Sequence, residues 1–385
     1  MVDDVSAVDY IRRGSRPTRS GGNGVSSVSK IARLLFISIL AAGLVAIACG
    51  GGGTTTASPT TGASVQPSPA AGELPKPEQA SVRIGISTPN EPVQFAEKLA
   101  DALGIYQKYG ITSVTVTGFE GDAKALQALV AGQLDYFVGG ASTALSSVAT
   151  DTPVKVVAMN STRLTDGLWC IPAIKTKEDV KGKSIAISTF GGTSHGSAIL
   201  LLQGIGYTAK DAVITQVGNQ GSRIAALKGG SVGCAVVDMS QEKAMRDAGM
   251  NLLFDETKAN LQWGRSGLMG KADFIAKNPN TTLVVVAATL EAQQKMWTDA
   301  STASKEFAKF AQIKDADAES LVKDFQGYGA RDMSFTEDAF KAPKEVLATQ
   351  NAAIANVDVT KAFDLSFLKK LKDIGFNTKI GVPSS

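Results

Sequence analysis

The sequence predicts an α/β fold with two similar lobes and a helical C-terminal part. From residue 81 onward, strand patterns alternate with helical patterns, which is typical of α/β proteins with largely parallel sheets. A helix, a glycine turn and a strand occur at residues 125–135 and again at residues 223–233. Two similar lobes are the simplest explanation, and a chance likeness of two βα units is the alternative. After residue 272, helical patterns follow one another without strands.

Each element is expected from its own pattern. Val82, Ile84 and Ile86 alternate as in a strand, and Pro92 suits the first turn of the next helix. Further strands are expected at residues 114–116, 134–138, 154–159, 168–174, 184–188, 213–217, 233–238 and 251–254. After the last of these strands, helices are expected at residues 282–312, 315–326, 336–355 and 360–373.

The front of the chain is expected to be an export signal, residues 1–48. Residues 34–48 are uncharged behind Lys30 and Arg33, and the run is short for a membrane-spanning helix. The segment before Lys30 is unusually long, which a start codon assigned too early would explain. The run ends in Ala-Ile-Ala-Cys, which resembles a bacterial lipobox, so we expect a lipid on Cys49. An ordinary secretion signal and a buried helix are the alternatives.

Behind Cys49, residues 50–80 are rich in glycine, threonine, serine and proline, and they predict a flexible tether. A lipid followed by such a tether would hold a soluble body near a membrane. Cys170 and Cys234 could form a disulfide outside the cytoplasm, but we expect two buried free thiols.

The composition argues against several classes of function. Lys and Arg total 39 and Asp and Glu total 36, and the excess lies entirely in the first 48 residues. A neutral body has no electrostatic footprint for nucleic acid. A single histidine and three cysteines argue against most zinc sites and most histidine-dependent catalysis. We therefore expect no metal and no cofactor.

Five short motifs occur in a fixed order along the body. They lie at residues 100–111, 128–135, 177–183, 223–233 and 274–279. Together they resemble signature segments of bacterial solute-binding proteins for ABC importers of the nitrate, sulfonate, taurine and thiamine-pyrimidine-precursor type. The resemblance covers about residues 81–380. One departure is Gly233, where the family usually has an aspartate at a helix-to-strand turn.

The resemblance implies a type II periplasmic-binding-protein fold, in which two lobes joined by two crossing strands close on a ligand. Lobe one would comprise residues 81–173 and 267–385, and lobe two residues 174–266. The chain would cross at residues 169–173 and return at residues 266–271. The resemblance also implies a monomeric receptor that is not an enzyme. It would deliver a small polar organic solute to the permease and ATPase of an ABC importer, outside the cytoplasmic membrane.

Ligand contacts are expected where strand ends of both lobes meet helix starts. Ser142 and Thr193 are the strongest candidates, because a hydroxyl beside free amides suits an oxyanion; an ordinary N-cap is the alternative. Trp169 and Trp263 could stack on a planar ligand or fill the core. The expected ligand contacts are Thr88, Asn90, Glu91, Gly121, Asp122, Ser142, Thr143, Asn160, Thr189, Phe190, Thr193, Ser194, His195, Asp238 and Trp263.

The charges near these loops favour one kind of solute. Acidic residues outnumber basic ones, and a solute with an amine, such as a taurine-like zwitterion or an aminopyrimidine, suits such a cleft. Helix N-termini could still hold a naked anion such as nitrate. The residues compared are Glu91, Glu120, Asp122 and Asp238 against Arg163 and Arg265.

Residues 192–196, Gly-Thr-Ser-His-Gly, match the nucleophile elbow of hydrolases. His195 is the only histidine and lies next to Ser194, whereas a catalytic triad takes its base from a separate loop. We therefore expect a turn whose amides and hydroxyls face the cleft. An enzyme that uses Ser194 or a cofactor-bound pyrimidine-type site is one alternative function. A ligand-sensing surface lipoprotein without a transporter is another.

Overall fold

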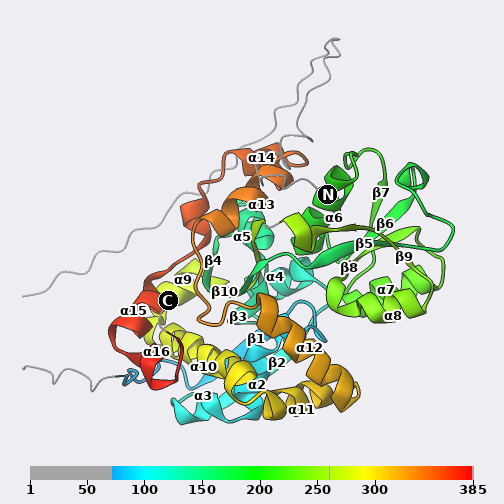
Figure 1. Cartoon of the computed structure of the whole chain (residues 1–385). Helices are drawn as coiled ribbons and strands as arrows, with labels where there is room; N and C mark the ends of the chain where they lie inside the picture. Colours follow the sequence, from blue (N-terminus) through cyan, green and yellow to red (C-terminus); the bar gives the residue numbers. More distant parts are fainter. Residues whose placement is uncertain (1–71, 260, 384–385) are drawn as a thin grey trace, which may run out of the picture. The chain divides into compact units, whose positions relative to one another are not determined.

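The computed structural model describes residues 72–259 and 261–383 (Figure 1). The expected signal peptide, Cys49 and most of the expected tether lie outside these residues. Within the described residues, ten strands form two five-stranded sheets. No helix among them is long and apolar enough to cross a membrane.

The first sheet has the strand order β2-β1-β3-β10-β4. Its strands are β1 (Ser81–Ile86), β2 (Ser113–Gly118), β3 (Tyr136–Gly139), β4 (Val154–Arg163) and β10 (Gln262–Lys271). Strand β1 is parallel to β2 and β3, whereas β10 is antiparallel to β3 and β4. The sheet is therefore mixed and not largely parallel as expected.

The second sheet has the order β7-β6-β8-β5-β9. Its strands are β5 (Asp166–Cys170), β6 (Ser184–Ile187), β7 (Val213–Gln216), β8 (Cys234–Asp238) and β9 (Asn251–Asp255). Strand β5 is antiparallel to β8 and β9, and β6 is parallel to β7 and β8. The antiparallel pairs arise because the chain leaves the first sheet through β4 and β5 and returns through β9 and β10, in the opposite direction.

The two connections between the sheets lie earlier in the chain than expected. The first connection is residues 164–165, between β4 and β5, and the second follows β9 at residue 256 and ends before β10. Trp169, expected at a crossing, is inside β5 and pairs with Ala235 of β8. Ser266 is likewise inside β10. The crossing that the resemblance placed at residues 169–173 therefore begins inside a buried strand of the second sheet.

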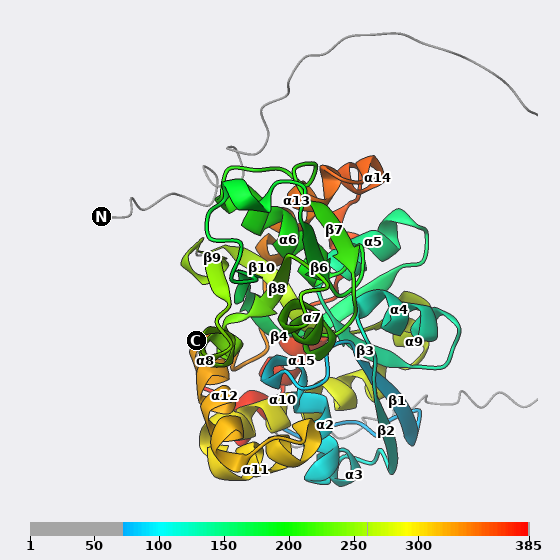
Figure 2. The same cartoon turned by 90° about the vertical axis from the view of Figure 1, so that its right-hand side faces the viewer.

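Helices surround both sheets (Figures 1 and 2). Three helices accompany the second sheet: α6 (Thr193–Gly204), α7 (Gln220–Lys228) and α8 (Glu242–Asp247). The helices of the remaining body are α2 (Ala96–Ala102), α3 (Ile105–Lys108), α4 (Asp122–Val130), α5 (Ala141–Ala149), α9 (Ala272–Lys277), α10 (Pro279–Thr298), α11 (Ala300–Ala311), α12 (Asp315–Tyr328), α13 (Asp338–Ala348), α14 (Ala352–Ala355), α15 (Ser366–Asp373) and α16 (Phe376–Lys379). Short 3-10 turns are η1 (Pro92–Gln94), η2 (Glu178–Val180), η3 (Met239–Gln241), η4 (Glu256–Ala259) and η5 (Val359–Ala362).

The helical C-terminal part is present, with more breaks than expected. One helix was expected over residues 282–312, but Asp299 separates α10 from α11. The Asp299 side chain accepts a hydrogen bond from the amide of Thr302 and so caps α11. Helix α10 contains the fully buried run 283–288, which packs in the same core as β1 and α2. It is therefore a core helix of the first sheet.

Residues 72–80 belong to the body, although the expected tether extends to residue 80. The amide of Gly72 donates to the carbonyl of Ile374 at 2.6 Å. The Glu78 carboxylate accepts hydrogen bonds from the amides of Asn280 and Thr281, which are free donors at the start of α10. Any tether therefore ends before residue 72.

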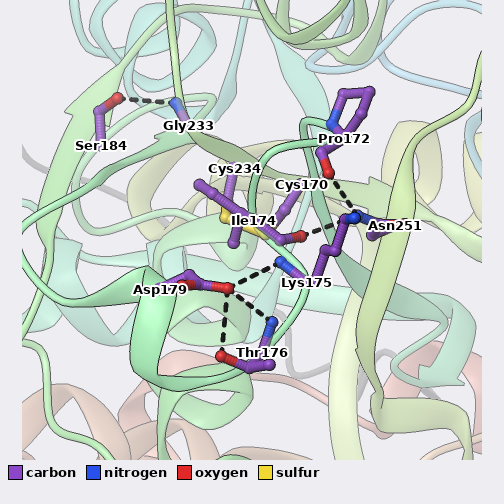
Figure 3. The surroundings of a disulfide bond; sticks show 10 residues. All are labelled: Cys170, Pro172, Ile174, Lys175, Thr176, Asp179, Ser184, Gly233, Cys234 and Asn251. Atoms are coloured by element: carbon purple, nitrogen blue, oxygen red, sulfur yellow. Dashed lines mark hydrogen bonds between the residues drawn. A yellow bond between two sulfur atoms is a disulfide. The ribbon is translucent and has the colours of Figure 1, made fainter.

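Cys170 and Cys234 form a disulfide, so the expectation of two free thiols is wrong (Figure 3). The two cysteines are directly opposite each other in the antiparallel pair β5–β8, and both side chains are fully buried. Next to the disulfide, the Ser184 hydroxyl accepts a hydrogen bond from the amide of Gly233. This contact holds the turn before β8 against the start of β6.

The disulfide can be checked by thiol counting on residues 50–385, which contain only these two cysteines. We expect no alkylation in denaturant without a reductant, and two alkylated cysteines after reduction. Denaturant is essential because buried free thiols in the folded protein would also resist the reagent. Two alkylated cysteines before reduction would contradict the disulfide, and mass spectrometry distinguishes the two results.

Candidate functional site

A small cavity lies where the two sheets face each other. Its volume is about 30 Å³. Its walls come from the segments after β1 and β6, the starts of α4, α6 and β5, helix α7 and strand β10. The lining residues are Thr88, Glu91, Val93, Gln94, Asp122, Asp166, Ser188, Thr193, Ser194, Arg223, Arg265 and Ser266. We call this space the cleft cavity.

Arg265 joins the two sides of the cleft cavity. It lies in β10 of the first sheet and is 5% exposed. Its Nη2 donates to Asp238 of the second sheet at 2.5 Å and to Glu91 at 3.1 Å, and lies 4.0 Å from Asp166. Burial alone would lower the pKa of Arg265, but Asp238 and Glu91 together raise it. The guanidinium is therefore a fixed positive charge.

A second buried arginine faces the cavity from the second sheet. Arg223, in α7, is 2% exposed and donates from Nε to the carbonyl of Val236 at 2.8 Å. Its Nη1 donates to the carbonyl of Gly218 at 3.2 Å. Nη1 of Arg265 has no hydrogen-bond partner in the part of the chain that the structure describes. Two buried arginines thus line one small space.

Glu91 can be either charged or neutral near neutral pH. Burial raises its pKa to about 7, although the positive charge of Arg265 acts in the opposite direction. Its carboxyl group is therefore partly protonated near neutral pH. The cavity can consequently present either a carboxylate or a neutral acid to a solute.

Asp122 connects the two sides through hydrogen bonds. Its Oδ2 accepts from the Thr143 hydroxyl at 2.7 Å and from the amides of Gly140 and Thr193 at 3.3 and 3.4 Å. The Thr193 hydroxyl in turn donates to the carbonyl of Arg265 at 3.2 Å. A Cβ on Gly140 would lie 1.9 Å from Thr193 Oγ1, so only glycine permits this approach. The two sides are closed against each other here.

Five of the expected ligand contacts line the cleft cavity: Thr88, Glu91, Asp122, Thr193 and Ser194. Others lie in the contact between the two sides without lining the cavity. Gly121 has a φ of 130° and closely approaches Thr189, whose Oγ1 accepts from the amide of Ala123. Thr143 and Asp238 each contact a residue that lines the cavity: Thr143 donates to Asp122, and Asp238 accepts from Arg265. As ligand contacts, all of these residues remain predictions.

Four expected residues lie elsewhere. Asn90 and Phe190 are exposed, Phe190 to 53%. Asn160 is buried inside the first sheet, where its amide donates to Gln293 at 3.1 Å. Trp263 is fully buried and contacts Gly196 of α6. Because β4 extends to Arg163 instead of ending at residue 159, Asn160 falls within the strand and not at its end.

Ser142 and His195 are buried but do not line the cavity. The Ser142 hydroxyl has no hydrogen-bond partner among the described residues. Nδ1 of His195 accepts from the amide of Gly191, and burial lowers the pKa of this histidine.

Ser194 does not have the surroundings of a hydrolase nucleophile. Its hydroxyl accepts from the amide of Ser188 at 2.8 Å and shares a hydrogen bond with the Ser188 hydroxyl at 2.7 Å. The hydroxyl therefore fixes the loop after β6. These contacts fit the expected turn better than a nucleophile elbow, in which a general base contacts the serine.

The sequence did not single out several lining residues as ligand contacts: Val93, Gln94, Asp166, Ser188, Arg223, Arg265 and Ser266. Arg265 was considered only as one of the basic residues near the expected ligand loops. The sequence nevertheless marks Arg265, because it is the one charged residue within residues 263–270, and a charge inside a buried strand requires a partner. The structure also places two of the compared charged residues away from the cleft cavity. Glu120 pairs with Lys124 at the surface, and Arg163 lines a different cavity.

Comparison with known proteins places the chain in a family. Residues 95–303 match the NMT1/THI5-like family, and the chain belongs to that family. No curated protein matches the chain. The expected resemblance to solute-binding proteins of ABC importers is confirmed.

Solved structures share the fold. The alkanesulfonate-binding protein SsuA from Xanthomonas axonopodis pv. citri, bound to MOPS, is 19% identical, with a TM-score of 0.63, over 75% of this chain and 99% of that one. The periplasmic nitrate-binding protein NrtA from Synechocystis PCC 6803 is 16% identical, with a TM-score of 0.66, over 81% and 93%. The periplasmic aliphatic sulphonate-binding protein SsuA from Escherichia coli is 20% identical, with a TM-score of 0.59, over 74% and 92%. The chain therefore has the expected periplasmic-binding-protein fold.

Proposed function

We propose that this protein is an extracytoplasmic receptor that binds a small polar organic solute and delivers it to an ABC importer. The two sheets with their helices act as two lobes, and the connections between them act as the hinge. A lipid on Cys49 and a tether over residues 50–71 hold the receptor at the outer face of the cytoplasmic membrane. Family membership and the fold support a binding role without a catalytic step.

The convergence of charged residues from both lobes on the cleft cavity is the observation that carries this proposal. Arg265 and Glu91 come from one lobe, and Arg223 and Asp166 from the other, while Asp238 of the second lobe pairs with Arg265 beside the cavity. Buried charges are costly unless each has a partner, so such a set is expected mainly at a binding site. Because both signs are present, a zwitterion or another amine-bearing polar solute fits best.

The solute must replace contacts that the protein now makes with itself. At about 30 Å³ the cleft cavity is about tenfold smaller than the roughly 300 Å³ of the smallest typical ligand pockets, so it is too small for an organic solute. The ion pair between Arg265 and Asp238 closes the lobes directly. We infer that opening separates this pair, and that an acidic group of the solute then pairs with Arg265 while an amine pairs with Asp238 or Glu91.

Calorimetric titration of residues 50–385 tests the proposal. The panel contains taurine, an alkanesulfonate, nitrate and an aminopyrimidine. We expect taurine or the aminopyrimidine to bind, and thermal melting to shift upward with the bound solute. Tight nitrate binding without binding of any amine would overturn the preference for amine-bearing solutes. Conversion of a solute to a product would overturn the assignment as a receptor.

A further inference from the structure

One carboxyl oxygen of the first lobe lies at the start of a helix of the second lobe. Oδ2 of Asp122, in the first turn of α4, accepts a long hydrogen bond of 3.4 Å from the amide of Thr193, the first residue of α6. The same oxygen accepts from the Thr143 hydroxyl at 2.7 Å and from the amide of Gly140, the N-cap of α5, at 3.3 Å. Asp122 is the acceptor in all three contacts, as a carboxylate must be.

Two helix starts, one from each lobe, therefore meet at the same carboxyl oxygen. Amides at the start of a helix are donors without a helical acceptor, and the helix dipole gives them a partial positive charge that attracts anions. Helix α5 has 9 residues and α6 has 12, so both are long enough for this effect. Ser142 and Thr193 were the strongest candidates for an oxyanion site. In this structure, the anion beside Thr193 is the protein's own Asp122.

The carboxyl group of Asp122 fills its position closely. Asp122 is 4% exposed. A Cβ added to Gly139 of the first lobe would lie 3.4 Å from Cγ of Asp122, and a Cβ added to Gly192 of the second lobe would lie 3.4 Å from its Oδ2. The cleft cavity beside it measures only about 30 Å³. A solute's anionic group can therefore reach these amides only if the carboxyl group of Asp122 leaves them.

We propose that Asp122 is an internal anion that determines which solutes this receptor accepts. It occupies the amides of Thr193 and Gly140, so a naked anion such as nitrate cannot bind there, and it keeps the two lobes in contact when no solute is bound. The acidic group of a zwitterionic solute is thereby directed to Arg265. This inference rests on the proposed receptor function and adds the residue that selects against a naked anion.

Formate is a suitable probe, because it is a small carboxylate that can replace the one removed in Asp122→Ala. In residues 50–385 with this change, we expect about 100 mM formate to raise the melting temperature by about 3 °C, against less than about 1 °C for the wild type. The other buried acids of the cavity do not oppose this binding, because formate only restores the charge that Asp122 supplied. Asp122→Asn keeps the position filled and should respond like the wild type. The matched control is Glu120→Ala, which changes an exposed glutamate of the same loop and should also respond like the wild type.

Nitrate is the second probe. In calorimetry, Asp122→Ala should bind nitrate at least about tenfold more tightly than the wild type, because its free donors then form hydrogen bonds to a charged group. Equal effects of formate and nitrate on the wild type and Asp122→Ala would overturn the inference, and so would an equal response of Asp122→Asn. Absence of any solute binding to the wild type would count against the receptor function and leave the formate result unchanged, so the two failures are distinguishable.

A second variant keeps the test decisive if Asp122→Ala is unstable. Asp122→Ser also removes the carboxyl group but keeps a polar side chain at the start of α4, where serine is well tolerated. Formate should raise the melting temperature of Asp122→Ser in the same way. If neither variant folds even when it is purified in about 100 mM formate, the inference is overturned, because the added anion should replace the missing carboxylate.

Discussion

Replacing Arg265 with methionine is expected to lower the free energy of unfolding by about 4 kcal/mol. Methionine fills a similar length of space but carries no charge. Asp238, Glu91 and Asp166 would then remain buried, each at most 6% exposed, without the cation that faces all three. Leaving a buried charge without its partner costs far more than loss of an exposed pair. Urea denaturation at pH 7 measures the difference.

The loss of stability in Arg265→Met should depend on pH. Without Arg265, the pKa of Glu91 rises further, so the folded state retains protons that the unfolded state releases. Stability of the variant should therefore fall more steeply than that of the wild type as pH rises from 5 to 8. The control is Arg246→Met, which removes an exposed partner of Glu242 and should cost less than about 1 kcal/mol. A loss below about 1 kcal/mol at pH 8 for Arg265→Met would show that Arg265 does not neutralise this cluster.

The cleft was predictable from the sequence where it depends on strand ends. Asp122 and Thr193 each follow a strand and a short glycine-containing loop, one in each sheet, and ligands of α/β proteins bind outside the carboxyl ends of such strands. Both residues reach the cleft cavity. Arg265 and Arg223 were harder to place, because they lie inside a strand and a helix. Which face such a side chain takes depends on register, and a shift of one residue in a strand reverses it.

The disulfide illustrates the same limit. Cys170 and Cys234 are 64 residues apart in sequence, and they meet because β5 pairs with β8 in one particular register. Neither the spacing nor the apolar pattern around each cysteine specifies that register. Asn160 lies away from the cleft cavity for a related reason, since its place depends on where β4 ends. Alternation of apolar residues shows reliably that a strand exists, but it does not show at which residue the strand ends.

Glu97 provides the second large prediction, in the core of the first sheet. It lies in α2 and is fully buried. Neither carboxyl oxygen forms a hydrogen bond of good geometry among the described residues, although the Asn160 side chain is near enough to act against the effect of burial on the pKa. Burial raises its pKa from 4.5 to about 7. Replacing Glu97 with glutamine should therefore raise the free energy of unfolding at pH 8 by up to roughly 3 kcal/mol. The amide keeps the shape of the side chain and needs no proton to stay neutral.

The direction of the pH dependence follows from proton binding. Between pH 4.5 and 7, the folded state keeps the Glu97 proton while the unfolded state has released it, so the stability of the wild type falls as pH rises. Above about pH 7 both states have lost the proton, and this contribution becomes constant. The advantage of Glu97→Gln should thus be small at pH 4.5, grow up to pH 7 and then level off.

Denaturation of both proteins at several pH values tests this profile. Glu345→Gln is the matched control, because Glu345 is exposed on α13 and its replacement should change stability by less than about 0.5 kcal/mol at every pH. Other buried acids, including Glu91, affect both proteins equally and cancel in the comparison. A constant difference between Glu97→Gln and the wild type across this range would show that Glu97 is already ionised in the folded state. Some buried donor would then have to serve its carboxylate.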